Sequence, residues 1–126
     1  MANKSEELRK VITRLLKLSC TRTYYSEAKD NAKYPYQVFI FDSQTREQYP
    51  REDDIIIIDI WDKSNSWTEV ERLADEIEAN MNMKNEPNSF VLPTFFMIDR
   101  KNLKDPDKNL KHVLLKFLIQ NYYIGV

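Results

Sequence analysis

Residues 4–19 carry hydrophobic side chains every three or four positions, which predicts an amphipathic helix. These positions are Leu8, Val11, Ile12, Leu15 and Leu16. Asn3 and Glu6 have the spacing of a capping box and predict where this helix begins.

Residues 66–81 repeat the helical pattern. The apolar positions are Val70, Leu73, Ala74, Ile77 and Met81. Ser66 and Glu69 again have capping-box spacing, so a second helix is predicted over this range.

Five other segments are rich in β-branched and aromatic residues and predict strands. They span residues 21–25, 36–41, 54–61, 90–98 and 111–123. The polar segment 42–51, which contains Pro50, predicts a long loop or hairpin connection. The segment 102–109, which contains Pro106, predicts the turn of a final hairpin.

The order of these elements is neither a strict alternation of strands and helices nor a helical bundle. It predicts an α+β fold: a mixed, mainly antiparallel sheet of four to five strands with two amphipathic helices on one face. The chain has 126 residues and no internal linker. We therefore expect a single domain over residues 1–126.

Both faces of each long predicted strand are apolar. In the segment 54–61, for example, Ile56, Ile58 and Ile60 alternate with Ile55 and Ile57. Two helices can cover only one face of such a sheet. Because large exposed apolar patches are uncommon on monomers, either the sheet curls onto itself or another subunit covers the second face, and we favour the second.

Composition removes several functional classes. Nineteen Lys and Arg against 20 Asp and Glu leave a net charge of −1, so the overall charge of the chain does not favour binding to a polyanion. The single glycine, Gly125, leaves no glycine-rich phosphate loop, and one His with one Cys cannot form a Cys/His zinc site or an intramolecular disulfide. We expect no cofactor and no sequence-specific nucleic-acid binding.

The hydropathy pattern also bears on location. Residues 1–7 are polar, and the longest apolar run, Ile55–Ile58, has four residues. A membrane span needs about 20. We expect synthesis in a cytoplasm and no membrane insertion.

Four carboxylates around the segment 54–61 are candidate ligands for a divalent metal, as in a small nuclease. They are Asp53, Asp54, Asp59 and Asp62. On an extended strand Asp59 and Asp62 point to opposite faces, which argues against one shared metal. The alternative reading is that Asp53 and Asp54 end a strand and Asp59 has a polar partner across the sheet or an interface.

Two other candidate sites have simpler structural explanations. Cys20 and His112 could form a nucleophile and base, but a partly buried thiol is the default. Lys10, Arg14 and Lys17 form a basic stripe that could contact nucleic acid, although a solvated helix face is far more common.

The order of short aromatic landmarks resembles the tail-completion and head-to-tail joining proteins of long-tailed phages and prophages. The landmarks are Thr23-Tyr24-Tyr25, Tyr34-Pro35-Tyr36-Gln37-Val38, Ile58-Asp59-Ile60-Trp61-Asp62 and the helix 67–81. The resemblance covers residues 5–85. Richness in Lys, Asn and Ile suggests a prophage element of a low-GC Gram-positive bacterium.

This resemblance implies a non-enzymatic virion protein without a cofactor. Such proteins form a ring, often of six subunits, at the head-proximal end of the tail, where they meet the tail-tube protein and the head connector. The implied locations are the host cytoplasm during assembly and then the neck of the virion tail.

The resemblance also suggests which residues make these contacts. A ring interface between adjoining sheets would bury Ile55, Ile57, Asp59 and Trp61, or the even-numbered residues that alternate with them. The polar loop would face the lumen or a partner protein. Its candidate residues are Gln44, Arg46, Glu47 and Arg51.

Two alternatives stay open. The first is a metal-dependent nuclease or nucleic-acid-processing domain that uses Asp53, Asp54 and Asp59. The second is a dimeric regulatory or adaptor domain, which shares the apolar surface and differs mainly in stoichiometry.

Overall fold

A computed structural model describes residues 3–46 and 50–124 of the chain. The elements, in chain order, are α1 (Lys4–Leu16), β1 (Thr23–Tyr25), β2 (Tyr36–Arg46), β3 (Arg51–Lys63), α2 (Thr68–Met81), β4 (Val91–Lys104) and β5 (Leu110–Tyr123). No helix within these residues is long and apolar enough to cross a membrane.

The strands form one sheet of five strands in the order β1-β2-β3-β5-β4. Strand β1 runs parallel to β2, and the other neighbouring pairs are antiparallel. The predicted mixed, mainly antiparallel sheet and the α+β class are therefore confirmed.

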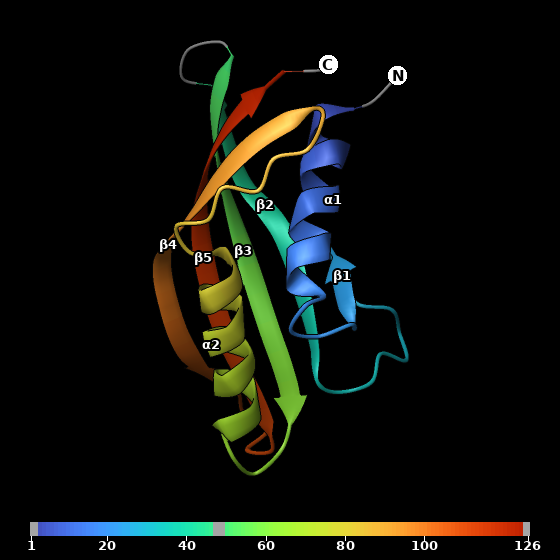
Figure 1. Cartoon of the computed structure of the whole chain (residues 1–126). Coiled ribbons are helices and arrows are strands. Elements are labelled where there is room, and N and C mark those ends of the chain that lie inside the picture. The colour runs from blue at the N-terminus through green and yellow to red at the C-terminus, as the bar shows by residue number, and fades with distance from the viewer. Residues whose placement is uncertain (1–2, 47–49, 125–126) are drawn as a thin grey trace.

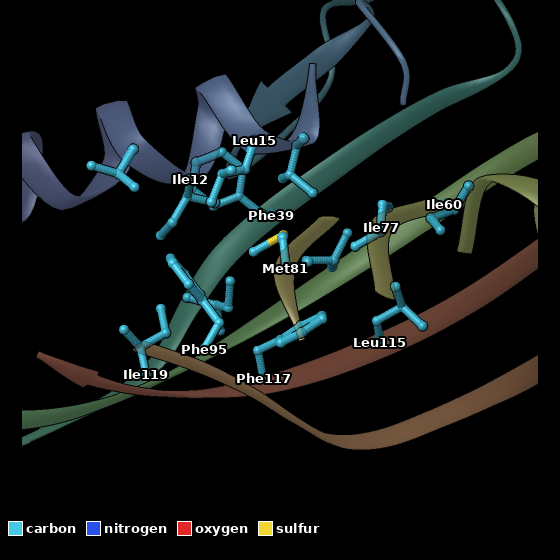
Figure 2. Packing of buried hydrophobic residues seen from close by; sticks show 14 of the residues in the cluster. Ile12, Leu15, Phe39, Ile60, Ile77, Met81, Phe95, Leu115, Phe117 and Ile119 are labelled. Carbon is cyan, nitrogen blue, oxygen red and sulfur yellow. The ribbon is translucent and has the colours of Figure 1, made fainter. Parts of the chain in front are cut away.

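Both helices pack on the same face of the sheet, as predicted (Figure 1). The apolar stripe of α1, including Ile12 and Leu15, meets Phe39 of β2, and Ile77 and Met81 of α2 lie over the central strands (Figure 2). Burial of this shared core against the sheet stabilises both helices, because helices of 13 and 14 residues are marginal on their own.

Residues of β3 alternate strictly between two environments. The even-numbered residues from Glu52 to Asp62 are buried beneath the helices, and the odd-numbered residues from Arg51 to Trp61 are only partly buried. This period of two is that of an extended strand with its side chains on opposite faces. We call the second face, on which neither helix packs, the open face.

Of the two alternatives predicted for residues 42–51, the hairpin connection is confirmed and the long loop is wrong for most of its length. Strand β2 continues to Arg46 and β3 begins at Arg51, with a register shift between Phe41 and Ser43. The polar residues fit a strand because this part of the hairpin extends toward solvent, where their side chains are exposed.

The predicted final turn is also too long. Strand β4 continues to Lys104 after a register shift between Met97 and Asp99, so the turn into β5 is short. In both strands a bulge adds one unpaired residue and interrupts the pattern that sequence reasoning follows.

The helix ends agree in part with the predictions. Asn3 Oδ1 accepts hydrogen bonds from Ser5 N and Glu6 N, so the predicted cap of α1 is confirmed, but α1 ends at Leu16 rather than residue 19. Helix α2 begins two residues later than predicted, and its cap residue, Trp67, makes no side-chain cap bond.

Candidate self-association face

The register of the sheet brings the odd residues of β3 together with residues of three other strands. Ile55 lies opposite Ser43 of β2 and Leu118 of β5, and Leu118 lies opposite Phe96 of β4. Direct cross-strand neighbours have Cβ atoms about 5 Å apart. An apolar row therefore crosses the open face, and its three apolar members, Ile55, Leu118 and Phe96, are partly exposed.

A second row runs beside the first. Ile57 lies opposite Ile40, whose relative exposure is 39%, on one side and Lys116 on the other. Leu114, two residues before Lys116 on β5, adds apolar surface to the same face. The apolar part of the open face thus extends across four strands.

An aromatic and polar cluster lies at the other end of this face. The Trp61 ring stacks on His112 with a centroid distance of 3.7 Å, and His112 Nε2 donates to Asp59 Oδ1 at 2.6 Å. Tyr36 lies opposite Trp61, and its ring centroid is 5.3 Å from that of Tyr34. Burial, followed by the neighbouring Tyr34, raises the pKa of Tyr36.

The four predicted self-association residues, Ile55, Ile57, Asp59 and Trp61, share the open face. The prediction of a polar partner for Asp59 is confirmed, and that partner is His112. Sequence reasoning considered His112 only as a catalytic base beside Cys20. Cys20 instead lies in the hydrophobic core on the helix side, so the structure does not bring these two residues together.

The four candidate metal ligands do not converge. Asp54 and Asp62 belong to the buried, even-numbered set of β3, and Asp53 and Asp59 belong to the open face. Within the described residues, no group of three or more His, Cys, Asp and Glu side chains could hold a metal ion. The arrangement therefore does not favour the metal-dependent alternative.

A buried polar cluster lies where β3 and β5 pass beneath the start of α1. Asp54 and Asn121 are fully buried, and Lys4 Nζ lies 3.1 Å from Glu52 Oε2 and 4.9 Å from the ring centroid of Tyr123. Neither carboxylate oxygen of Asp54 nor the side-chain amide of Asn121 has a partner with full hydrogen-bond geometry, although Gln44 and Tyr123 are close enough to lower the pKa of Asp54. Burial, followed by the charge of Glu52, raises the pKa of Asp54 to about 7.

Sequence reasoning did not find this cluster. The sequence feature that could have indicated it is the even numbering of Glu52 and Asp54. On an extended strand these residues share one face with Ile56 and Ile58.

The residues predicted to face a lumen or partner lie on or beside the β2–β3 hairpin. Gln44 and Arg46 are exposed on β2, and Arg51 on β3 pairs with Asp53 at 3.0 Å. Glu47 lies outside the described residues. The contacts of these residues with another protein stay a prediction.

No protein-family model and no curated protein sequence matches the chain. Its fold is similar to that of a chain in the solved structure "Virion of native gene transfer agent (GTA) particle". The TM-score is 0.69 at 11% sequence identity, and the alignment covers 94% of this chain and 91% of that chain. A second solved structure, whose name states no function, has a TM-score of 0.67 at 7% identity and coverages of 94% and 93%. At these identities the similarity establishes a shared fold.

Proposed function

We propose that this chain is a non-enzymatic structural subunit of a phage-like virion. In this proposal it forms a ring at the head-proximal end of the tail and joins the tail tube to the head connector. The observation that carries the proposal is the fold similarity to a chain of a gene transfer agent virion, which extends over nearly the whole of both chains.

The open face supports self-association. It presents Ile40, Ile57, Leu118 and Phe96 on one side of the sheet, and Ile40 is 39% exposed. The described chain has an accessible surface of 7203 Å². Two interfaces that each bury about 800 Å² per subunit would cover roughly a quarter of it, which a ring of such subunits can accommodate.

The proposal is tested by light scattering coupled to size exclusion over a wide concentration range, followed by negative-stain imaging. We expect closed rings with a central hole. The variant Ile57→Lys places a charge in the apolar rows and should leave the protein monomeric, because an unpaired charge in an interface is strongly unfavourable.

The matched control is Leu18→Lys. Leu18 is 65% exposed and follows α1, away from the open face, so this variant should assemble as the wild type does. Wild-type protein that stays monomeric both alone and with assembled tail tubes would contradict the proposal.

A further inference from the structure

An open groove of about 490 Å³ runs along the outward side of α1 and reaches the edge strand β1. Its lining residues are Glu6, Arg9, Lys10, Thr13, Arg14 and Tyr25. Three cationic side chains therefore face one carboxylate. The guanidinium of Arg9 lies 4.6 Å from the ring centroid of Tyr25 on β1, which holds one cation at the sheet edge.

The other two cations each have one carboxylate partner within the chain. Lys10 lies 3.3 Å from Glu7, and Arg14 lies 3.4 Å from Glu86. The side chains of Lys10 and Arg14 are 62% and 55% exposed. The more exposed Arg14–Glu86 pair contributes little to stability, so Arg14 can take a new anionic partner at little cost. The partner of Lys10, Glu7, is buried, but the ammonium group of Lys10 is itself exposed and has donors left for a second anion.

The side of α2 that faces the edge strand β4 has the opposite charge. Glu71, Asp75 and Glu78 lie at i, i+4 and i+7 and thus share one side of the helix. They face the edge strand β4, where Arg100 contacts Asp75 and Glu78. We call these three residues the acidic stripe.

The neighbouring charges on α2 do not cancel the acidic stripe. Glu69 and Glu76 add two carboxylates, and the nearby cations are Arg72, which pairs with both, and Arg100. The charged side chains of α2 together with Arg100, which are five carboxylates and two guanidinium groups, sum to a net charge of −3.

The Tyr25 end of the α1 groove and the acidic stripe lie toward opposite edges of the sheet, while Arg14 in the groove pairs with Glu86, which bonds to Pro93 of β4. The groove includes Tyr25 of β1, and the stripe contacts Arg100 of β4, and these strands end the order β1-β2-β3-β5-β4. Two different, complementary surfaces on one subunit produce head-to-tail contacts, which close into a ring or extend into a filament.

We propose that the α1 groove binds the acidic stripe of a second copy of this chain, so that subunits join head to tail. This inference rests on the proposed self-association and adds its direction. The open face lies on the other side of the sheet from the two helices and is a separate apolar surface. The charged contact selects the orientation of the neighbour, because electrostatic complementarity determines specificity more than affinity.

A charge-swap experiment tests the inference. One variant carries Lys10→Glu and Arg14→Glu, and the other carries Asp75→Lys and Glu78→Lys. Each variant on its own places charges of the same sign opposite each other at the contact. The concentration at which half the protein is assembled should therefore rise at least about tenfold. An equal mixture matches each altered surface with its opposite charge and should restore assembly with both variants in equal amounts.

The matched control for the first variant is Lys29→Glu with Lys108→Glu, which lowers the net charge by the same amount at two exposed positions outside the groove. It should assemble as the wild type does. Circular dichroism on every variant confirms that the fold is intact.

Normal assembly of both charge variants alone, or a mixture that fails to recover, would overturn the head-to-tail contact. If Ile57→Lys still abolishes the rings in that case, the proposed function stands without it. A wild type that never assembles would instead contradict both.

Discussion

The two faces of β3 carry similar residues but have different environments. Ile56 and Ile58 on the helix side are fully buried, and Ile55 and Ile57 on the open face are only partly buried. The transfer free energy of an isoleucine side chain is the same on either face. The difference in burial comes from α1 and α2, which pack on one face.

The carboxylates of β3 differ in the same way. Asp54 is fully buried, its oxygens have no partner with full hydrogen-bond geometry, and its pKa is raised to about 7. Asp59, on the open face, accepts a hydrogen bond from His112 at 2.6 Å. The two aspartates of this strand thus differ in environment: Gln44 of β2 and Tyr123 of β5 lower the pKa of Asp54 without offsetting its burial, whereas His112 of β5 bonds directly to Asp59.

The largest effect is expected from truncating a helix-side isoleucine. Ile58→Ala removes atoms from a fully packed core and should lower the free energy of unfolding by about 4 kcal/mol. Ile57→Ala should lower it by less than about 1 kcal/mol in the monomer, because its site is partly solvated. Urea unfolding at concentrations where the protein is monomeric measures both. Equal losses would show that the two faces are equally packed.

A smaller, pH-dependent effect is expected from Asp54→Asn. The folded state holds the Asp54 proton up to about pH 7, while an unfolded aspartate loses it near pH 4. The wild type should therefore lose stability as the pH rises from about 4 to about 7, and little more above that.

The asparagine variant lacks this loss, so its advantage over the wild type should grow to about 2 kcal/mol at pH 8. A pKa of about 7 in the folded state against about 4 in the unfolded state sets an upper limit of about 4 kcal/mol. Urea unfolding at pH 4 and pH 8 measures the difference, with Asp53→Asn on the open face as the control. A wild type that is more stable than Asp54→Asn at pH 8 would contradict the expected penalty.

The smallest effect is expected from the hydrogen bond on the open face. Asp59→Asn, His112→Ala and the double variant form a thermodynamic cycle, and its coupling free energy should be about 1 kcal/mol, since both side chains are partly solvated. Chemical unfolding of the four proteins at pH 6 gives this value. A coupling of zero would mean that the stacking of His112 on Trp61, rather than the hydrogen bond, holds the ring in place.

For the candidate site, the sequence could predict which residues of a single strand share a face, but not which residues of other strands lie beside them. The period of two puts Ile55, Ile57, Asp59 and Trp61 on one face, because side chains of a strand point alternately to opposite sides. The partner of Asp59 was not predictable, because His112 faces it only through the register of β3 with β5.

Bulges limited the prediction of the other strands. In β2 the residues paired with the open-face side of β3 change from even-numbered Ile40 to odd-numbered Ser43 across Asp42. In β4 the residues paired with the open-face side of β5 change from Phe96, opposite Leu118, to Asp99, opposite Lys116, across Ile98. A prediction based on strict alternation does not account for such a shift, because the extra residue in the bulge has no paired residue on the neighbouring strand.

The sequence by itself determined the two helices, the central strands and the α+β class. These features follow from hydrophobic spacing, which depends only on neighbours along the chain. Only the tertiary structure decided which apolar face of the sheet became the core and which became the open face. The two faces of β3 carry nearly equal apolar surface, so the choice depends on where the helices pack.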